Sequence, residues 1–203
     1  MRRRRAWRAG AYRRGRVRGS PGGRQSVTRA RPRPEGRVEH RRAVALQTVQ
    51  YRSRFGVSAA ALFAFHHRDD ALSVLMPPWE RARVVSRTGG LAVGARTVIE
   101  TRVLPGVWLR WVAVHDAFEE GTMFADRAER GPFAHWRHVH RVTAEGASES
   151  WLDDTITYAL PLGFVADRVA GAWVRRRLDA MFRFRHEATA RALGTAVIAG
   201  HGR

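Results

Sequence analysis

FAHWRHVHRVT (residues 133–143) is the first of three segments whose patterns together predict the fold. Aromatic, histidine and aliphatic side chains occupy every second position of Trp136–Val142, and arginine and valine fill the positions between them. A period of two is typical of a β-strand with one face toward a core. A second alternating segment, SWLDDTITYAL (residues 150–160), follows a turn signal at Glu145-Gly146. The two segments predict strands joined by a tight turn.

The next segment, FVADRVAGAWVRRRLDAMFRFRHEATARAL (residues 164–193), has the period of a helix. One stripe of it contains Val174, Leu178, Met181 and Arg185, flanked by Phe182. An amphipathic helix buries its apolar stripe against another element, which here is the preceding sheet. The sequence therefore predicts a long C-terminal helix, Phe164–Leu193, packed on strands.

Further strand patterns precede this region and are separated by Gly- and Pro-containing turn signals. They cover Arg83–Arg87, Ala95–Leu104, Val107–Phe118 and Met123–Glu129. Short strands joined by tight turns predict an antiparallel meander, because parallel strands need long crossover connections.

The first ordered segment begins near Ala45, where alternation in Val49–Phe55 predicts another strand. Ser58 is placed to cap a short helix over Ala59–Phe65, and Asp69 or Asp70 to cap a second one that ends before Pro77-Pro78. His66-His67 beside the two aspartates are expected in an exposed loop. The predicted fold class is α+β: a curved antiparallel sheet of about seven strands around the long helix, with two short helices after the first strand.

Charge divides the chain into two parts. Residues 1–42 hold 16 Arg against Glu35 and Glu39, a net charge of +14, and the rest holds 21 Arg against 16 acidic residues, a net charge of +5. Because it has few apolar side chains, we expect a disordered Arg-rich arm over residues 1–44. The arm is a solvated tail or misassigned start, a non-specific phosphate-binding segment, or a targeting segment. Nucleic acid is thus a possible partner only through the arm.

Composition excludes several classes of protein. There is no cysteine, so no disulfide or Cys-ligated metal is expected. No apolar run approaches the roughly 18 residues of a membrane helix, and no secretory signal is visible. We expect a cytoplasmic protein. Nucleotide-binding glycine loops, zinc-protease histidine pairs and Gly-x-Ser-x-Gly are absent from the sequence.

Several motifs, in this order, resemble those of the START, polyketide-cyclase and birch-pollen-allergen superfamily, also called SRPBCC, and of its bacterial ligand-binding branch. They are LMPPWE (75–80), RWVAVH (110–115), GPFAHWRHVHR (131–141), the segment 154–163 that ends in YALPLG, and MFRFRH (181–186). The resemblance implies a helix-grip domain over residues 45–195, followed by a flexible tail, 196–203. It also implies a cavity between the sheet and the last helix, but no single activity.

Strand alternation and helix periodicity place one set of side chains toward this cavity. The candidate ligand-binding residues are Trp111, His115, Trp136, His138, His140, Asp154, Tyr158, Leu178, Met181 and Arg185. Apolar walls with a few polar groups suit a small-molecule site.

The polar members of this set have alternative roles. His138 and His140 could pair with Asp154, contact a ligand, act in acid–base catalysis, or bind a metal ion, for which two histidines at i and i+2 are weak evidence alone. Arg185 needs a partner, either Asp126 or Asp154 in a salt bridge or a ligand carboxylate or phosphate.

The favoured interpretation is a binding module for an apolar or amphipathic small molecule, with no catalytic residue, metal or cofactor assigned. The alternatives are a polyketide-cyclase-like or dehydratase-like enzyme that uses His138, His140, Asp154 or Tyr158 as acid or base, and phosphate binding through the arm. The ligand and the oligomeric state stay open at this point.

Overall fold

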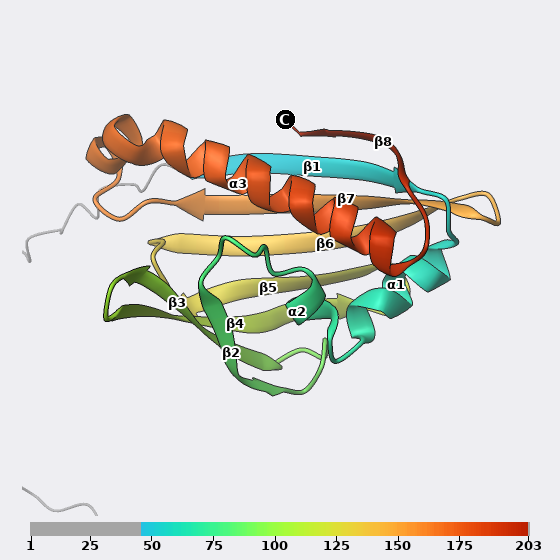
Figure 1. Ribbon diagram of the computed structural model, residues 1–203, viewed down its shortest axis with the longest axis horizontal. Helices are drawn as coiled ribbons and strands as arrows, with labels where there is room; N and C mark the ends of the chain where they lie inside the picture. Colours follow the sequence, from blue (N-terminus) through green and yellow to red (C-terminus); the bar gives the residue numbers. More distant parts are fainter. Residues whose placement is uncertain (1–45, 203) are drawn as a thin grey trace, which may run out of the picture. The chain divides into compact units, whose positions relative to one another are not determined.

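The computed structural model describes residues 46–202 (Figure 1). The Arg-rich arm, with its expected disorder and phosphate binding, lies outside the described residues. The strands are β1 (Gln47–Phe55), β2 (Ala82–Thr88), β3 (Arg96–Leu104), β4 (Val107–Glu119), β5 (Met123–Arg130), β6 (His135–Glu145), β7 (Glu149–Ala159) and β8 (Val197–Gly202). The helices are α1 (Ala59–His67), α2 (Ala71–Val74) and α3 (Phe164–Ala192). Within the described part, no helix is long and apolar enough to cross a membrane.

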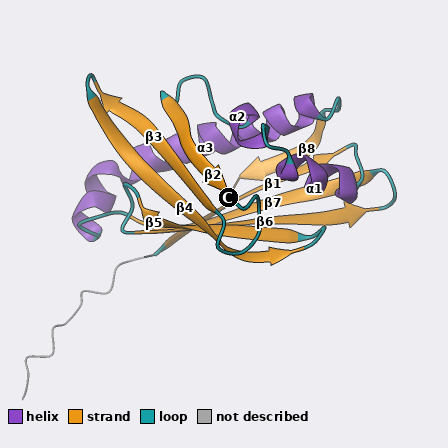
Figure 2. Ribbon diagram, turned by 90° about the horizontal axis from the view of Figure 1, so that it is seen from below, coloured by secondary structure: helices purple, strands orange, loops and turns teal. Residues whose placement is uncertain are grey.

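The strands form one antiparallel sheet in the order β2-β3-β4-β5-β6-β7-β1-β8. The register shifts twice between β4 and β5, at Val112/Ala113 and His115/Ala117. Such bulges bend a strand and increase its twist. The sheet curves, and α3 runs along its concave side (Figures 1 and 2). The predicted α+β architecture is therefore confirmed.

The C-terminal segment differs from expectation. Residues 196–203 were expected to be a flexible tail, but Val197–Gly202 forms β8 and pairs with β1, with Phe55 opposite Val197 and Tyr51 opposite Gly202. Gly194, at φ 66°, allows the left-handed turn that ends α3 and reverses the chain. An unpaired edge strand offers a row of backbone donors and acceptors, and pairing with them needs no apolar alternation. The sheet thus has eight strands rather than seven.

Helix α3 is anchored by a stripe that differs slightly from the predicted one. Val174, Leu178, Phe182 and His186 are buried along it, whereas Met181 and Arg185 lie half-buried beside them. Phe182 is completely buried and stacks on Tyr51 of β1 at 4.7 Å between ring centroids. The Tyr51 hydroxyl donates a hydrogen bond of 2.7 Å to Asp179 Oδ1. These contacts fix the rotation of α3 over the sheet.

Helix α1 starts as predicted, because the Ala61 N–H donates to the Ser58 hydroxyl at 3.3 Å. It continues beyond the expected end at Phe65, to His67. His66 therefore comes four residues after Leu62 on the buried face and is only 5% exposed. The expectation of an exposed loop was wrong for His66.

Phe182→Ala is expected to lower the free energy of unfolding by about 3–5 kcal/mol, because it removes a completely buried ring from the contact between helix and sheet. Trp173→Ala, on an exposed face of the same helix, is the matched control and should change it by less than about 0.5 kcal/mol. Urea unfolding measures both. Similar losses in the two variants would mean that α3 packs in another rotation.

Candidate functional site

The concave face of the sheet carries the residues that the sequence placed inward. Trp136 and His138 on β6 and Asp154 and Tyr158 on β7 are all buried. The strand register sets Trp136 opposite Tyr158 and His140 opposite Asp154. The predicted faces of β6 and β7 are therefore confirmed, whereas contact of these residues with a ligand stays a prediction.

The apolar half of this interior consists mainly of aromatic rings. Trp111 lies 5.0 Å from Trp136 and Phe133 lies 4.9 Å from Trp136, measured between ring centroids. Leu178 of α3 is buried in the same cluster, and Met181 packs against it. The Tyr158 hydroxyl donates a hydrogen bond of 3.0 Å to the Gln47 side-chain oxygen. Its hydrogen-bond partner is therefore a glutamine and not one of the histidines.

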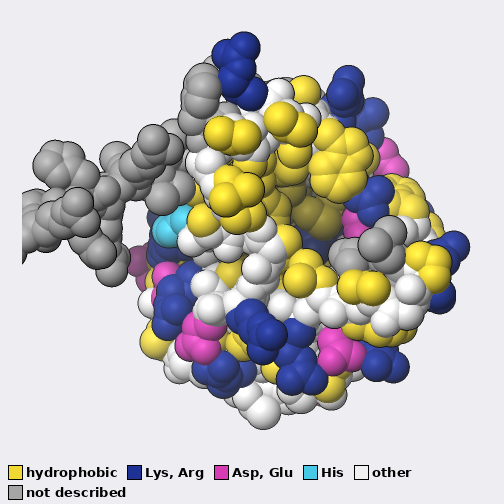
Figure 3. Space-filling model, turned by 90° about the vertical axis from the view of Figure 1, so that its left-hand side faces the viewer, with side chains coloured by type: hydrophobic (Ala, Val, Ile, Leu, Met, Phe, Trp, Pro, Cys, Tyr) yellow, Lys and Arg dark blue, Asp and Glu magenta, His cyan; other side chains and the backbone are white. Residues whose placement is uncertain are grey.

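A hollow rimmed by hydrophobic side chains opens at the end of the domain where α3 begins (Figure 3). Val165, Val169 and Trp173 fall four residues apart on the first half of α3 and are 60%, 84% and 62% exposed. Val107 and Trp108, at the start of β4, are about half exposed. Exposed apolar groups gathered at one end of a domain mark a place where another apolar molecule can bind.

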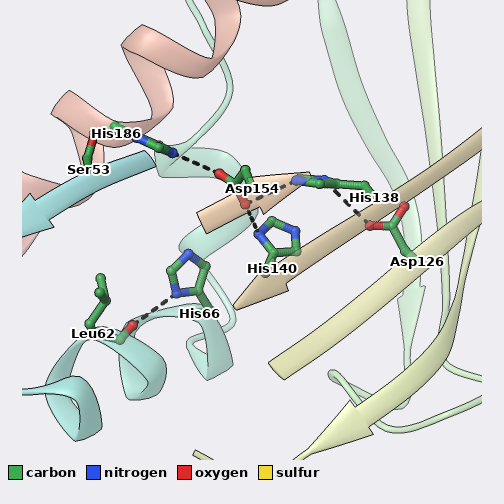
Figure 4. Close-up of polar contacts among 8 residues, drawn as sticks. All are labelled: Ser53, Leu62, His66, Asp126, His138, His140, Asp154 and His186. Atoms are coloured by element: carbon green, nitrogen blue, oxygen red, sulfur yellow. Dashed lines mark hydrogen bonds and ion pairs between the residues drawn. The ribbon is translucent and has the colours of Figure 1, made fainter. Parts of the chain in front are cut away.

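The polar half of the interior is centred on Asp154, which is 2% exposed (Figure 4). Its Oδ1 lies 3.1 Å from His138 Nε2 and 2.6 Å from His140 Nδ1. Its Oδ2 lies 2.8 Å from His186 Nε2, and His186 Nδ1 lies 2.6 Å from the Ser53 hydroxyl. The pairing of His138 with Asp154, one of the alternatives drawn from sequence, is therefore present.

A second carboxylate, Asp126 of β5, borders the same histidines. Asp126 stands directly opposite His138 in the strand register, and its Oδ2 lies 3.8 Å from His138 Nδ1. His115 of β4 is opposite Asp126 on the other side, and its Nδ1 is buried without a hydrogen-bond partner among the described residues. Asp126, His138 and His140 have the donor atoms to hold a metal ion.

Burial determines the electrostatics of this cluster. It lowers the pKa of His138 and of His140, and it lowers the pKa of His66 to about 4, to which the nearby His140 contributes. Burial alone would raise the pKa of Asp154, but the charges and hydrogen bonds of His140 and His138 hold it well below its usual range. Burial raises the pKa of Asp126. The arrangement favours an ionised Asp154, whereas burial disfavours the protonated forms of His138, His140 and His66.

The salt bridge to Asp126 or Asp154, one of the roles predicted for Arg185, does not form. No carboxylate of the described residues lies within 4.0 Å of its guanidinium, and its buried Nε has no hydrogen-bond partner there. The guanidinium carbon lies 5.3 Å from the Phe182 ring centroid. Burial lowers the pKa of Arg185, which Asp154 and Asp126 oppose from a distance. From its half-buried position on α3, Arg185 lies near Asp154 and Asp126 but forms no ion pair with either.

Sequence reasoning missed two histidines of the site. His186 follows Phe182 by four residues and Leu178 by eight, so extending the buried stripe of α3 would have found it. His66 required the correct end of α1, which no Gly or Pro marks in the sequence.

The pKa of His66 predicts acid sensitivity. An unfolded histidine has a pKa of about 6.5. Between pH 6.5 and about 4, His66 is therefore protonated in the unfolded chain but neutral in the folded protein. This contribution to stability is complete above pH 6.5 and is lost as pH falls. It amounts to about 2 kcal/mol between pH 7 and pH 5. When the pH is lowered from 7 to 5, the free energy of unfolding of His66→Gln should therefore decrease by about 2 kcal/mol less than that of the unmodified protein. Urea unfolding at the two pH values measures this difference.

His67→Gln, at the exposed end of the same helix, controls for the loss of a histidine. An equal pH dependence in His66→Gln and the unmodified protein would contradict the burial of a neutral imidazole.

Comparison with known proteins gives similarity in structure but not in sequence. No family model matches the chain, and no curated protein matches it. Norcoclaurine synthase from Thalictrum flavum, solved in complex with dopamine and hydroxybenzaldehyde, superposes with a TM-score of 0.58 at 11% identity, covering 81% of this chain and 97% of that one. The protein TTHA0849 from Thermus thermophilus gives 0.53 at 16% identity, covering 72% and 99%. Ms6760 from Mycobacterium smegmatis gives 0.52 at 14% identity, covering 72% and 90%.

At these identities the comparison concerns the fold, and it agrees with the element order, the curved sheet and the position of the last helix. The chain therefore has the helix-grip fold, which it shares with these solved structures.

Proposed function

We propose that the chain binds an amphipathic small molecule between α3 and the sheet, with the apolar part of the ligand near the rim of the hollow and an anionic group at Arg185. The observation that carries this proposal is the half-buried guanidinium of Arg185, whose buried Nε has no hydrogen-bond partner and which forms no ion pair among the described residues. A buried cation is costly unless an anion accompanies it. A ligand carboxylate or phosphate would supply that anion.

The apolar half of the interior suits the rest of such a ligand. Trp111, Phe133 and Met181 are only partly buried, although they pack against the core. Covering these side chains with a hydrocarbon or aromatic group removes apolar surface from water, which contributes roughly 0.8 kcal/mol for each buried CH₂ group. Binding free energy would thus come mainly from this half, and orientation from Arg185.

The exposed stripe of α3 suits an entrance. Val165, Val169 and Trp173 lie on the first half of α3 and are largely exposed. An apolar ligand meets these side chains before it reaches the interior. The structure of norcoclaurine synthase with two small aromatic molecules supports the idea by analogy, because it shows that this fold can accommodate small ligands.

The proposal is tested with decanoate and decanol, which share one alkyl chain and differ in charge. The protein should bind decanoate more tightly than decanol, because only the carboxylate pairs with Arg185. Arg185→Gln should weaken decanoate binding about 10-fold or more and leave decanol binding nearly unchanged. Isothermal titration calorimetry measures both affinities.

Arg183→Gln is the matched control, because Arg183 lies two residues away on the exposed face of α3. It should keep the preference for decanoate. If neither compound binds, or if Arg183→Gln and Arg185→Gln weaken decanoate equally, the proposed anchor is wrong.

A further inference from the structure

We infer that Asp126, His138 and His140 form a binding site for a divalent transition-metal ion such as zinc. The site uses other residues than the anchor at Arg185 and does not depend on the proposed amphipathic ligand. One potential ligand atom from each of the three residues lies within 4.8 Å of the other two. Two imidazoles and one carboxylate are a donor set that zinc takes in proteins.

The strands hold these residues in position. His138 and His140 are two residues apart on β6 and face the same side, and Asp126 of β5 stands directly opposite His138. Directly opposed residues of neighbouring strands have Cβ atoms about 5 Å apart. Zinc ligands at about 2.0–2.1 Å from the metal are roughly 3.3 Å from one another, so small side-chain rotations close the site around an ion. No change in the backbone is required.

The contacts of His138 fit a proton on the nitrogen that faces Asp154 rather than on the one that faces Asp126. His138 Nε2 shares a hydrogen bond with Asp154 Oδ1, and a neutral imidazole carries a single N–H. If that proton is on Nε2, His138 Nδ1 presents a lone pair to Asp126 Oδ2 at 3.8 Å. Two acceptors facing each other are brought together by a shared proton or by a metal ion.

His140 has the same arrangement. Its Nδ1 lies 2.6 Å from Asp154 Oδ1, a distance at which two lone pairs would repel, although the contact lacks ideal hydrogen-bond geometry. A proton on Nδ1 leaves the lone pair of Nε2 free. In Figure 4, His138 lies between Asp154 and Asp126, with His140 beside it. With protons on His138 Nε2 and His140 Nδ1, both imidazoles donate to Asp154 and each keeps one lone pair for an ion.

Asp154 would hold the two metal-binding histidines in position. Metal-bound histidines usually donate their second N–H to a carboxylate, which fixes the ring orientation. Asp154 is itself held by His186, which contacts the Ser53 hydroxyl. Asp126, in contrast, has no hydrogen bond from any described residue. The two carboxylates thus have different roles: Asp154 orients the imidazoles and Asp126 completes the ligand set.

The donor chemistry selects the class of metal. Imidazole nitrogen suits zinc, iron, cobalt, nickel and copper, whereas calcium and magnesium prefer all-oxygen sites. The chain has no cysteine that could provide a competing thiolate site. Zinc and cobalt(II) are therefore suitable probes.

The test uses the full-length protein without a histidine tag, stripped of metal with a chelator and then freed of the chelator. Calorimetric titration with zinc chloride should show one ion per chain. Zinc at about 100 times its Kd should raise the Tm by roughly 5 °C or more. Asp126→Asn and His140→Gln should each weaken zinc binding at least about 10-fold, because each removes one ligand while keeping side-chain size.

His135→Gln is the matched control, since His135 is an exposed histidine on the same strand, β6. It should keep the affinity of the unmodified protein. Circular dichroism establishes that each variant is folded. If a variant does not fold, the visible absorption of cobalt(II) bound to the unmodified protein decides, because it reports nitrogen and oxygen coordination in a tetrahedral site.

The inference is overturned if the unmodified protein takes up no zinc in a one-to-one ratio, or if Asp126→Asn binds zinc as well as the unmodified protein does. The first result is expected if a proton on His138 bridges Asp126 and Asp154 in place of a metal. Equal weakening by His135→Gln would assign the binding to surface histidines and would also contradict it.

Discussion

A carboxylate in the centre of a protein has to be surrounded by hydrogen-bond donors. In this domain the buried carboxylate is Asp154, and its donors come from both the sheet and α3. Its donors come from His138 and His140 on the neighbouring strand and from His186 on α3. Removing one partner of a buried charge typically costs several kcal/mol, because the charge stays buried without compensation. The carboxylate therefore links the sheet to the long helix and favours one position of that helix.

The apolar contacts around Asp154 reinforce the same position. Phe182 lies between the polar cluster and Tyr51, stacking on the tyrosine ring and meeting the His138 ring edge-on at 5.1 Å. Four residues further along α3, His186 reaches Asp154. A rotation of the helix that broke one of these contacts would break the other, so packing and hydrogen bonding are coupled. The interior thereby contains an aromatic cluster beside Val174, Leu178 and Phe182 of α3 and a polar cluster around Asp154, which His186 of the same helix reaches.

This division is the basis of the two binding proposals. The aromatic half offers partly buried rings and an open rim, whereas Arg185 lies at the border with the polar half and lacks a counter-ion among the described residues. The histidines and Asp126 lie deeper and approach each other closely enough to share an ion. An amphipathic molecule and a metal ion would use adjacent sites, each built from side chains whose own polar groups are left without a complete set of partners.

Local sequence patterns were enough to predict most of the helices and strands and the faces of β6 and β7. Alternation has a period of two, so once β6 is placed, His138 and His140 must share a face, and the same argument places Asp154 and Tyr158 together on β7. The long helix also followed from periodicity alone. Tertiary structure decided the rest. β8 forms because β1 leaves backbone groups unpaired, a property of the assembled sheet and not of residues 197–202. His186 and Arg185 are one residue apart on α3, yet one reaches Asp154 and the other reaches no carboxylate. The rotation of the helix makes that difference, and it is set by contacts with β6 and β7 and with β1, which is more than a hundred residues earlier in the chain. No local pattern encodes these contacts.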